Sequence, residues 1–483
     1  MITRRKFNVG LLTTAFLSGL APKVLYANSR EDWDNLPIPP VQKNESTKKG
    51  YVKYTINVQK GFTEFFEGVR VPTLGYNGNI LGPTLRAKKG DIVEIVVNNK
   101  LDEETTVHWH GIIVPGEMDG GPHQRILPGK QWTAKFIVDQ QAATVWYHPH
   151  GIGTTASQVY WGLGGLFILD DEVSENLNIP NEYGIDDIPI IIQDKRFLND
   201  GRLVYLTSMR DIMFGMLGNT VLVNGAIEPK KTVPRGIVRF RLLNASNARS
   251  YLLKFDKQIP IFLIATDGGF IEKPIEINKI FLSPGERIEI LADFSSINEG
   301  DIVSLEDGNY KFLKFKIGKK GKNYEIPPRL ANFNKITKDE SFKTRDFVLS
   351  GLGHMVNING KQFDINRIDE IVEIGTTEIW RVSANMGMHR MMINNNGRNY
   401  VIHNFHAHGV LFQVLSRNGK PPALHERGWK DTIALRDGDT VELIMKFKKK
   451  GIFMYHCHIL EHEDNGMMGQ FLVKEDKSKG DLV

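Results

Sequence analysis

The sequence predicts an all-β protein built from three consecutive β-sandwich domains. Three similar segments recur: LPGKQWTAKFIV from residue 127, SPGERIEILADF from 283 and RDGDTVELIMKF from 436. Their glycines, Gly129, Gly285 and Gly438, lie 156 and 153 positions apart, a period too long for a solenoid that indicates one domain present three times. Each segment is a turn followed by alternating apolar residues, which is the pattern of a half-buried strand.

Each repeat also contains a second strand-like run. In chain order these runs are DIVEIVVNN from residue 91, GIVRFRLLNAS from 236 and TEIWRVSA from 377. Many short strands and few long helical patterns favour sandwiches. We expect linkers in the acidic stretch 170–187 and in GKKGKNYEIPPRL from residue 318, which gives domains over 45–172, 185–325 and 343–475.

Residues 1–27 predict an export signal. Arg4, Arg5 and Lys6 precede an apolar run over 9–21 that is short for a membrane span, and Ala27 is a small residue suited to cleavage. The arginine pair resembles a twin-arginine signal, with an ordinary signal as the alternative. We expect a periplasmic protein that is not inserted in the membrane once the signal is removed. Without this segment the formal charge falls from +5 to +1, which argues against a nucleic-acid partner.

Four His-x-His pairs predict a metal cluster. With 14 histidines in the chain, chance predicts about 0.4 such pairs. Residues i and i+2 of a strand point to the same face, so each pair presents two imidazoles together. Imidazole suits copper, zinc, iron and nickel, and eight ligands are too many for one ion. Two pairs lie in the first repeat and two in the third, so we expect a cluster between these repeats. The pairs are His108 and His110, His148 and His150, His406 and His408, and His456 and His458.

The only cysteine, Cys457, stands inside the last pair. It cannot form an intramolecular disulfide, and on a strand its thiol would face away from its two neighbours. His462 and Met467 follow at steps of five residues, and His403 lies three residues before the third pair. Two histidines, a thiolate and a weak axial methionine form the blue-copper electron-transfer set. The alternative is a small buried hydrophobic residue.

The motifs HWHG, HPHG, HNFHAHG and HCHILEHEDNGMM resemble the four copper motifs of the multicopper oxidases, in the family's order. The likeness continues in GYNGNILGPTLRAKKGD from residue 75, LVNGAIEP from 222 and GKPPALHERGWKDT from 419. Among family members, the chain most resembles the periplasmic cuprous oxidases and laccase-type enzymes. The resemblance implies three cupredoxin-like Greek-key domains, four copper ions and four one-electron oxidations of substrate coupled to reduction of dioxygen to two waters.

The resemblance also implies a role for each ligand. The type 1 ligands would be His403, Cys457, His462 and Met467; the type 2 ligands would be His108 and His406; and the type 3 ligands would be His110, His148, His150, His408, His456 and His458. The middle repeat has IPIFLIATDGG where the third has HAHGVLFQVLSRNG, so we expect a copper-free spacer. We expect His123 and His425 to be structural or surface residues.

Dioxygen reduction consumes protons, and a buried cluster needs acids to supply them. Asp119 and Glu463 match family acids beside the trinuclear site and are the predicted catalytic residues. The alternative for each is a solvated loop carboxylate.

The prediction of the substrate depends on the segment NMGMHRMM at 385–392. Thioethers favour Cu(I), so the segment is a candidate entry site for cuprous ion; the alternative is an apolar loop, since methionine also fills irregular gaps. The candidate ligands are Met386, Met388, His389, Met391 and Met392. By contrast, Met209, Met213 and Met216 have helical spacing and are expected in the core.

The chain departs from the cuprous-oxidase pattern in three places. The long Met-rich insertion before the third domain is absent, and only His354 and Met355 stand there. Asn399 and Val401 replace an acid and a methionine, which weakens the prediction of a family-type Cu(I) site. Asn404 replaces the usual proline, a change we expect to matter little.

We therefore predict a monomeric copper-dependent oxidase that uses O2, oxidises Cu(I) or a small phenol and acts in periplasmic copper tolerance. The alternatives are a laccase-like phenol oxidase without that role, a non-catalytic exported cupredoxin protein in cell division or copper storage, and a two-domain nitrite reductase. The complete set of ten histidines, one cysteine and one methionine favours the oxidase over the scaffold. Three repeats and eight cluster histidines exceed what a nitrite reductase needs.

Overall fold

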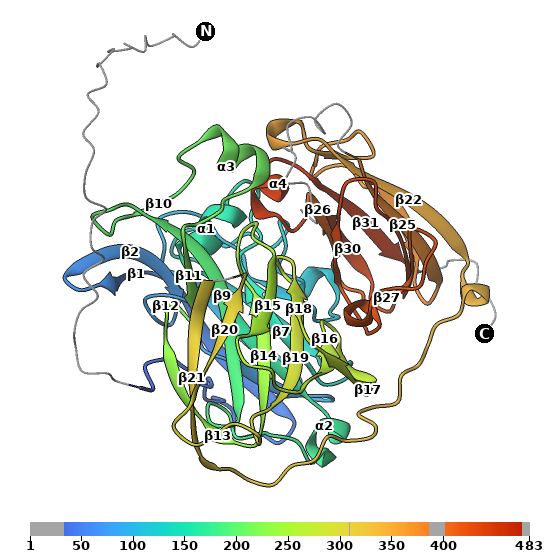
Figure 1. The fold of residues 1–483 in the computed structure, drawn as a ribbon. Helices are drawn as coiled ribbons and strands as arrows, with labels where there is room; N and C mark the ends of the chain where they lie inside the picture. The colour runs from blue at the N-terminus through green and yellow to red at the C-terminus, as the bar shows by residue number, and fades with distance from the viewer. Residues whose placement is uncertain (1–32, 309, 386–400, 476–483) are drawn as a thin grey trace. The chain divides into compact units, whose positions relative to one another are not determined.

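The computed structural model describes residues 33–308, 310–385 and 401–475, and their strands form three β-sandwiches in succession (Figure 1). The predicted signal at 1–27 and the Met386–Met392 candidate site lie outside the described residues. No helix in the described part of the chain combines the length and apolar character needed to cross a membrane.

The first sandwich has one sheet of order β2-β1-β4-β6 and another of order β3-β8-β7-β5. In β1 the residues Val52, Tyr54, Ile56 and Val58 alternate with less buried ones, and they join side chains of the second sheet in one apolar core. The strands are β1 (Tyr51–Phe66), β2 (Val69–Tyr76), β3 (Leu85–Lys88), β4 (Ile92–Asn99), β5 (His108–His110), β6 (Gln131–Ile137), β7 (Ala143–His148) and β8 (Gly165–Asp170).

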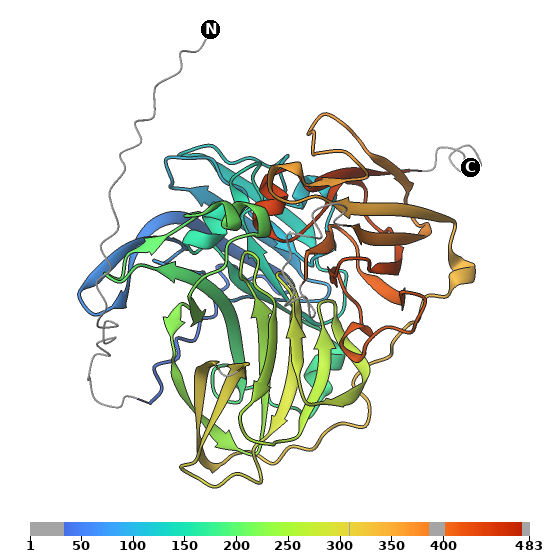
Figure 2. The ribbon, with the colours of Figure 1, turned by 45° about the horizontal axis from the view of Figure 1, so that its top comes forward.

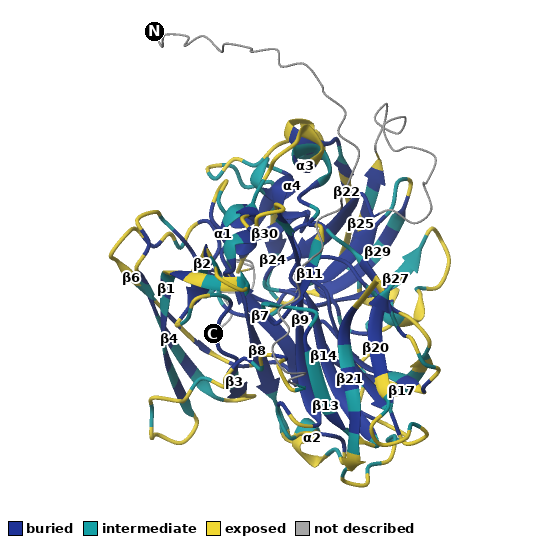
Figure 3. Ribbon diagram, turned by 60° about the vertical axis from the view of Figure 1, so that its left-hand side comes forward, coloured by how far each residue is buried: buried dark blue, intermediate teal, exposed yellow. Residues whose placement is uncertain are grey.

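The second sandwich has sheets of order β12-β11-β9-β14-β19-β16-β17 and β13-β21-β20-β15-β18, with β10 paired to β9. Strands β9 and β14 are buried almost throughout (Figure 3), because neighbouring elements cover both of their faces. The strands are β9 (Asp187–Phe197), β10 (Leu203–Val204), β11 (Thr220–Val223), β12 (Ala226–Ile227), β13 (Lys230–Arg235), β14 (Ile237–Asn244), β15 (Tyr251–Phe255), β16 (Ile261–Thr266), β17 (Gly269–Ile277), β18 (Ile280–Leu282), β19 (Arg287–Asp293), β20 (Ile302–Asp307) and β21 (Tyr310–Lys320).

The third sandwich has sheets of order β23-β22-β25-β29-β27 and β24-β31-β30-β26-β28 around a core that includes the buried Trp380. The strands are β22 (Lys343–Ser350), β23 (Asn357–Ile358), β24 (Glu370–Glu373), β25 (Thr377–Asn385), β26 (His403–Ala407), β27 (Phe412–Arg417), β28 (Thr432–Leu435), β29 (Thr440–Lys446), β30 (Gly451–His456) and β31 (Met468–Lys474).

One strand arrangement is repeated in all three sandwiches. One sheet contains the parallel pair β1/β4, β9/β14 or β22/β25, and the other sheet contains β3/β8, β13/β21 or β24/β31. The three recurring segments form β6, β19 and β29, each antiparallel to the second strand of its pair, β4, β14 or β25. Parallel neighbours require crossover connections, as Greek-key sandwiches have. The predicted all-β fold of three consecutive sandwiches is confirmed.

Two short helices, α1 of the first sandwich and α4 of the third, lie side by side (α4 is red in Figure 2). Ala156 and Val159 of α1 pack against Leu460 of α4. Helix α3 begins at a capping box made by Ser208 and Asp211. The helices are η1 (Gly116–Met118), α1 (Thr155–Trp161), α2 (Glu172–Asn176), α3 (Met209–Phe214), η2 (Lys338–Glu340), η3 (Gly353–Met355), η5 (Leu424–Glu426) and α4 (Leu460–Asp464).

Candidate metal centre

All eight histidines of the His-x-His pairs meet between the first and third sandwiches, and each is at most 1% exposed. Strand pairing brings them together, because His108 lies opposite His148 on β5 and β7, and His406 lies opposite His456 on β26 and β30. Only the first pair, on β5, lies wholly within a strand. In the other three pairs the strand ends within the pair, yet the second imidazole still reaches the same cluster.

The rings of the two sandwiches interleave. His108 stacks on His408, and His110 stacks on His406, each with ring centroids 3.8 Å apart. The Nε2 atom of His456 lies 3.0 Å from Nε2 of His150 and 3.1 Å from Nε2 of His408. We call these eight residues the histidine cluster.

The donor atoms of the cluster fit metal ions. The buried Nε2 atoms of His108 and His406 and both ring nitrogens of His458 have no hydrogen-bond partner, and such atoms are costly unless something binds them. Three groups of ring nitrogens each lie within 4.8 Å of one another: His108, His110 and His148; His108, His406 and His408; and His150, His408 and His456. Among the described residues, no such group includes a residue of the middle sandwich.

Burial keeps six histidines of the cluster ready to bind a cation. Burial, followed by the neighbouring imidazoles, lowers the pKa of His110, His148, His406 and His408 well below the usual value. Burial also lowers the pKa of His150 and His458 to about 3. These six rings are therefore neutral at pH 7, which is the form that binds metals.

A second candidate site surrounds Cys457, which directs its thiol away from the histidine cluster. Its Sγ lies 3.8 Å from Nδ1 of His403 and 3.8 Å from Nδ1 of His462, and these two nitrogens are 3.3 Å apart. Backbone hydrogen bonds join Met467 to Cys457 (3.0 Å) and to His462 (2.9 Å), and its side chain is fully buried. Burial raises the pKa of the Cys457 thiol to about 12, so metal binding must displace a proton. We call this the cysteine site.

The two predicted acids lie against the histidine cluster. Asp119 accepts a hydrogen bond from Nδ1 of His408 at Oδ2 (2.7 Å) and one from Nδ1 of His108 at its backbone oxygen (2.9 Å). Glu463 places Oε2 3.1 Å from Nδ1 of His456 and Oε1 3.5 Å from Nδ1 of His150. Both carboxylates are 2% exposed, so neither is a solvated loop residue.

The electrostatic environment of Glu463 favours the carboxylate form. Burial raises its pKa, but the imidazoles of His150 and His456 outweigh burial and bring the pKa down to about 2. Glu463 also lines a cavity of about 210 Å³ together with Gly151, Gln362 and other residues. The acid therefore lies between this cavity and the histidine cluster.

Two site residues were missed in the sequence. Asn404, expected to matter little, accepts from the backbone N–H of His458 (2.6 Å) and from the Cys457 thiol (3.6 Å), and donates to the backbone oxygen of Pro284 (2.8 Å). Asp431 lies 3.1 Å from Nε2 of His110. Asn404 lies within HNFHAHG and Asp431 within GKPPALHERGWKDT, but neither segment assigned a role to them, because their partners are distant in sequence. The replaced proline was the only signal at Asn404.

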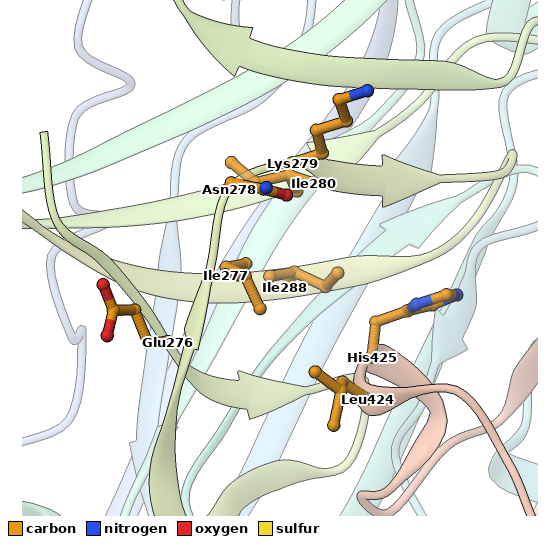
Figure 4. Close-up of a pocket in the computed structure, with 8 residues that line it drawn as sticks. All are labelled: Glu276, Ile277, Asn278, Lys279, Ile280, Ile288, Leu424 and His425. Atoms are coloured by element: carbon orange, nitrogen blue, oxygen red, sulfur yellow. The ribbon is translucent and has the colours of Figure 1, made fainter. Parts of the chain in front are cut away.

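The remaining candidates lie outside these two sites. His123 contacts Gln470, and His425 lines a groove of about 610 Å³ between β17, β18 and η5, which contains no predicted ligand (Figure 4). The prediction that Met209, Met213 and Met216 lie in the core is correct for Met216 alone. Met209 is 66% exposed and Met213 is half-buried, because α3 is a short helix at the surface.

Fold and site together define a three-domain cupredoxin protein with places for several metal ions. Models of the multicopper oxidase family match residues 57–174 and 325–477. The chain belongs to the multicopper oxidase family, and it is a copper-dependent oxidoreductase that uses O2 as acceptor.

Named relatives share nearly the whole chain. The multicopper oxidase Mco of Staphylococcus aureus is 44% identical, over 92% of this chain and 94% of its own. The laccase of Pediococcus acidilactici superposes with a TM-score of 0.86 at 38% identity, over 92% of this chain and 94% of its own. The cell division protein FtsP of Escherichia coli K12 is 36% identical, over 98% and 99% of the two chains.

Proposed function

We propose that the chain binds four copper ions and couples one-electron oxidation of substrate at the cysteine site to four-electron reduction of dioxygen to water at the histidine cluster. The observation that carries the proposal is the run His456-Cys457-His458, whose thiol belongs to one candidate site and whose imidazoles belong to the other. Bound copper supplies the one-electron redox chemistry. The chain supplies the shortest covalent connection between the sites, which is the backbone of these three residues.

The residues divide among the ions as the family pattern suggests. The cysteine site supports a type 1 ion because it combines two imidazoles, a thiol and a buried methionine. We assign His403, Cys457, His462 and Met467 to type 1, His108 and His406 to type 2, and His110, His148, His150, His408, His456 and His458 to the type 3 pair.

The two acids would supply protons at the histidine cluster. Asp119 has one buried carboxylate oxygen, Oδ1, without a hydrogen-bond partner, which leaves it able to accept and return a proton. Glu463 would pass protons from the cavity it lines to the cluster. The same two acids hold His108, His408 and His456 in place.

We propose Cu(I) as the reducing substrate, with small phenols as the alternative. Helix α3 and η3 both contact α4, which carries His462, and Nε2 of His462 donates to the backbone oxygen of Met213 (2.9 Å). The exposed thioethers of Met209 and Met355, 66% and 60% exposed, lie on these two segments with the exposed His354. Soft donors at the surface, on segments that contact the helix carrying His462, suit a cuprous ion. The Met386–Met392 candidate ligands stay a prediction.

Replacing both Met209 and Met355 with leucine should weaken Cu(I) oxidation selectively. Leucine preserves bulk but has no donor atom, so the apparent KM for Cu(I) should rise about tenfold, as a loss of about 1.4 kcal/mol in binding would give. Steady-state oxidation of Cu(I) and of a bulky phenol should be compared in the same preparations. The matched control is Met216→Leu, which alters a buried methionine. Equal changes toward both substrates would reject this Cu(I) site.

We propose export to the periplasm and a role in copper tolerance. The basic start, the apolar run and the paired arginines of residues 1–27 support export, and the proposed oxidation of Cu(I) supports the role in copper tolerance. Fractionation of cells expressing a C-terminally tagged chain should place the mature protein in the periplasm. Retention of the full-length chain in the cytoplasm would contradict this part of the proposal.

The likeness to FtsP raises a second candidate, a non-catalytic role in cell division. The convergence of all eight cluster histidines and of the cysteine site weighs against it, since a scaffold needs neither. A copper-loaded protein inactive toward both Cu(I) and phenols would favour this candidate.

A further inference from the structure

One histidine of the cluster is turned opposite to its neighbours. In five of the others, Nδ1 contacts an acceptor outside the cluster and Nε2 faces inward; these are His108, His148, His406, His408 and His456. In His110, Nδ1 faces inward, 3.3 Å from Nε2 of His148, and Nε2 lies 3.1 Å from Oδ1 of Asp431. Something must hold this ring in its reversed orientation.

The carboxylate of Asp431 is itself held by the guanidinium of Arg287, a residue of the middle sandwich. Nη1 of Arg287 donates to Oδ1 (2.7 Å) and Nη2 donates to Oδ2 (2.6 Å). The guanidinium also donates to backbone oxygens of Thr144, Asp267 and Gly285 at 2.9–3.2 Å. Both side chains are at most 1% exposed. A bidentate pair fixes a carboxylate in direction as well as in position.

The backbone at His110 is packed tightly against this pair. Gly111 has a φ of +88°, and a Cβ there would lie 2.6 Å from Nη2 of Arg287 and 2.8 Å from Oδ2 of Asp431. These contacts leave no room for a side chain at residue 111. The first, second and third sandwiches therefore meet at His110, Arg287 and Asp431.

We propose that Arg287 and Asp431 are positioning residues that hold His110 in the tautomer with its proton on Nε2, so that the lone pair of Nδ1 faces the histidine cluster. A carboxylate can only accept, so its contact with Nε2 requires a proton there. Such partners outside the ligand shell orient metal-binding histidines. The middle sandwich, predicted to be only a spacer, thereby acts on the metal centre. The copper-binding part of this inference rests on the proposed function.

A competing interpretation is that Asp431 is itself a ligand, since a ring nitrogen of His110, one of His406 and a carboxylate oxygen of Asp431 lie within 4.8 Å of one another. Both carboxylate oxygens are, however, already bound by the guanidinium. The positive charge of Arg287 at this carboxylate disfavours a cation there. The positioning role therefore fits the contacts better.

Asp431→Asn should disturb the fixed position of His110. The asparagine has one oxygen and one NH2 group where Asp431 has two acceptor oxygens. The amide therefore either turns its NH2 group to Nε2 of His110, which moves the ring proton to Nδ1, or turns it to Nη2 of Arg287, which breaks the bidentate pair. Nitrogen NMR of the copper-free protein, with ¹⁵N-labelled histidine and His110→Gln for assignment, reads this directly. Copper retention against a chelator should weaken about 10- to 100-fold, while the blue colour of the cysteine site stays.

Lys430→Gln is the matched control, because Lys430 lies next to Asp431 and pairs with Asp267 (2.8 Å) and Glu286 (2.9 Å) at the same buried junction. It should lower stability and leave the tautomer and copper retention unchanged. If Asp431→Asn does not fold, Arg287→Lys provides the same test. Lysine keeps the positive charge but cannot form the bidentate pair with Asp431. An Asp431→Asn variant that keeps the Nε2 proton together with wild-type copper retention, or equal copper loss in the control, would overturn the inference. Wild-type protein with the Nε2 proton but no cluster copper would refute the proposed function and leave the positioning role supported.

Discussion

Cys457→Ser is expected to abolish the blue colour and the oxidase activity while the histidine cluster still binds copper. The sulfur lies 3.8 Å from the facing nitrogens of both His403 and His462, so it completes the cysteine site. A serine hydroxyl does not provide the soft thiolate that a blue-copper site requires. The side chain is fully buried but small, so the fold should survive the exchange.

The test is an absorption spectrum, a copper count per chain and a turnover assay on the same preparation. Activity should fall to background, and the copper count should fall by about one ion, as removal of a single blue-copper site implies. Met467→Leu is the control, because an axial methionine is a weak ligand and its loss should keep the colour and much of the activity. A blue and active Cys457→Ser protein would show that the type 1 assignment is wrong.

The sequence was informative wherever spacing along one strand or one short loop decides the geometry. The repeated turn-and-strand segments became β6, β19 and β29, in equivalent places of three sandwiches. The four His-x-His pairs converged because strand register sets His108 against His148 and His406 against His456. These features depend on local periodicity, which the order of residues records directly.

Contacts between sandwiches could not be predicted in the same way. Asp431 reaches His110 across 321 positions, and Arg287 reaches Asp431 across 144. The helical spacing of Met209 and Met213 predicted burial, but α3 is too short to have a fully covered face, and Met209 is exposed. Periodicity indicates which face of an element is apolar; it does not say which other element will cover that face.

The middle sandwich shows most clearly how features set by local periodicity differ from contacts between sandwiches. Its sequence lacks copper motifs, and within the described residues it supplies no member of a metal-binding group. Yet it supplies the backbone oxygen of Met213 that accepts from His462, and the backbone oxygen of Pro284 that accepts from Asn404. Its contribution is a rigid set of hydrogen-bond partners around ligands from the outer sandwiches, which supports pre-organised metal sites.

Removing the acid function at Asp119 and Glu463 is expected to slow dioxygen reduction strongly while leaving the cysteine site intact. In the proposed reaction, each reduced dioxygen consumes four protons, and these are the two predicted proton donors, both buried against cluster histidines. The substitutions are Asp119→Asn and Glu463→Gln, which preserve shape. A positioned acid or base contributes about 10²- to 10⁴-fold, so each variant should be reoxidised by O2 at least about 100-fold more slowly.

The measurement is stopped-flow reoxidation of the fully reduced, copper-loaded protein by O2, followed through the returning blue colour, in H2O and in D2O. A proton-limited step should slow further in D2O, whereas a variant that has merely lost copper should show a lower final amplitude without that isotope effect. Glu461→Gln is the matched control: this buried glutamate lies on the same helix α4 but binds Tyr205, Asn247 and the backbone of Met216. It should reoxidise at the wild-type rate. If both acid variants also reoxidise at that rate with a full copper complement, the protons reach the cluster by another route, and the two carboxylates serve only to hold the imidazoles in place.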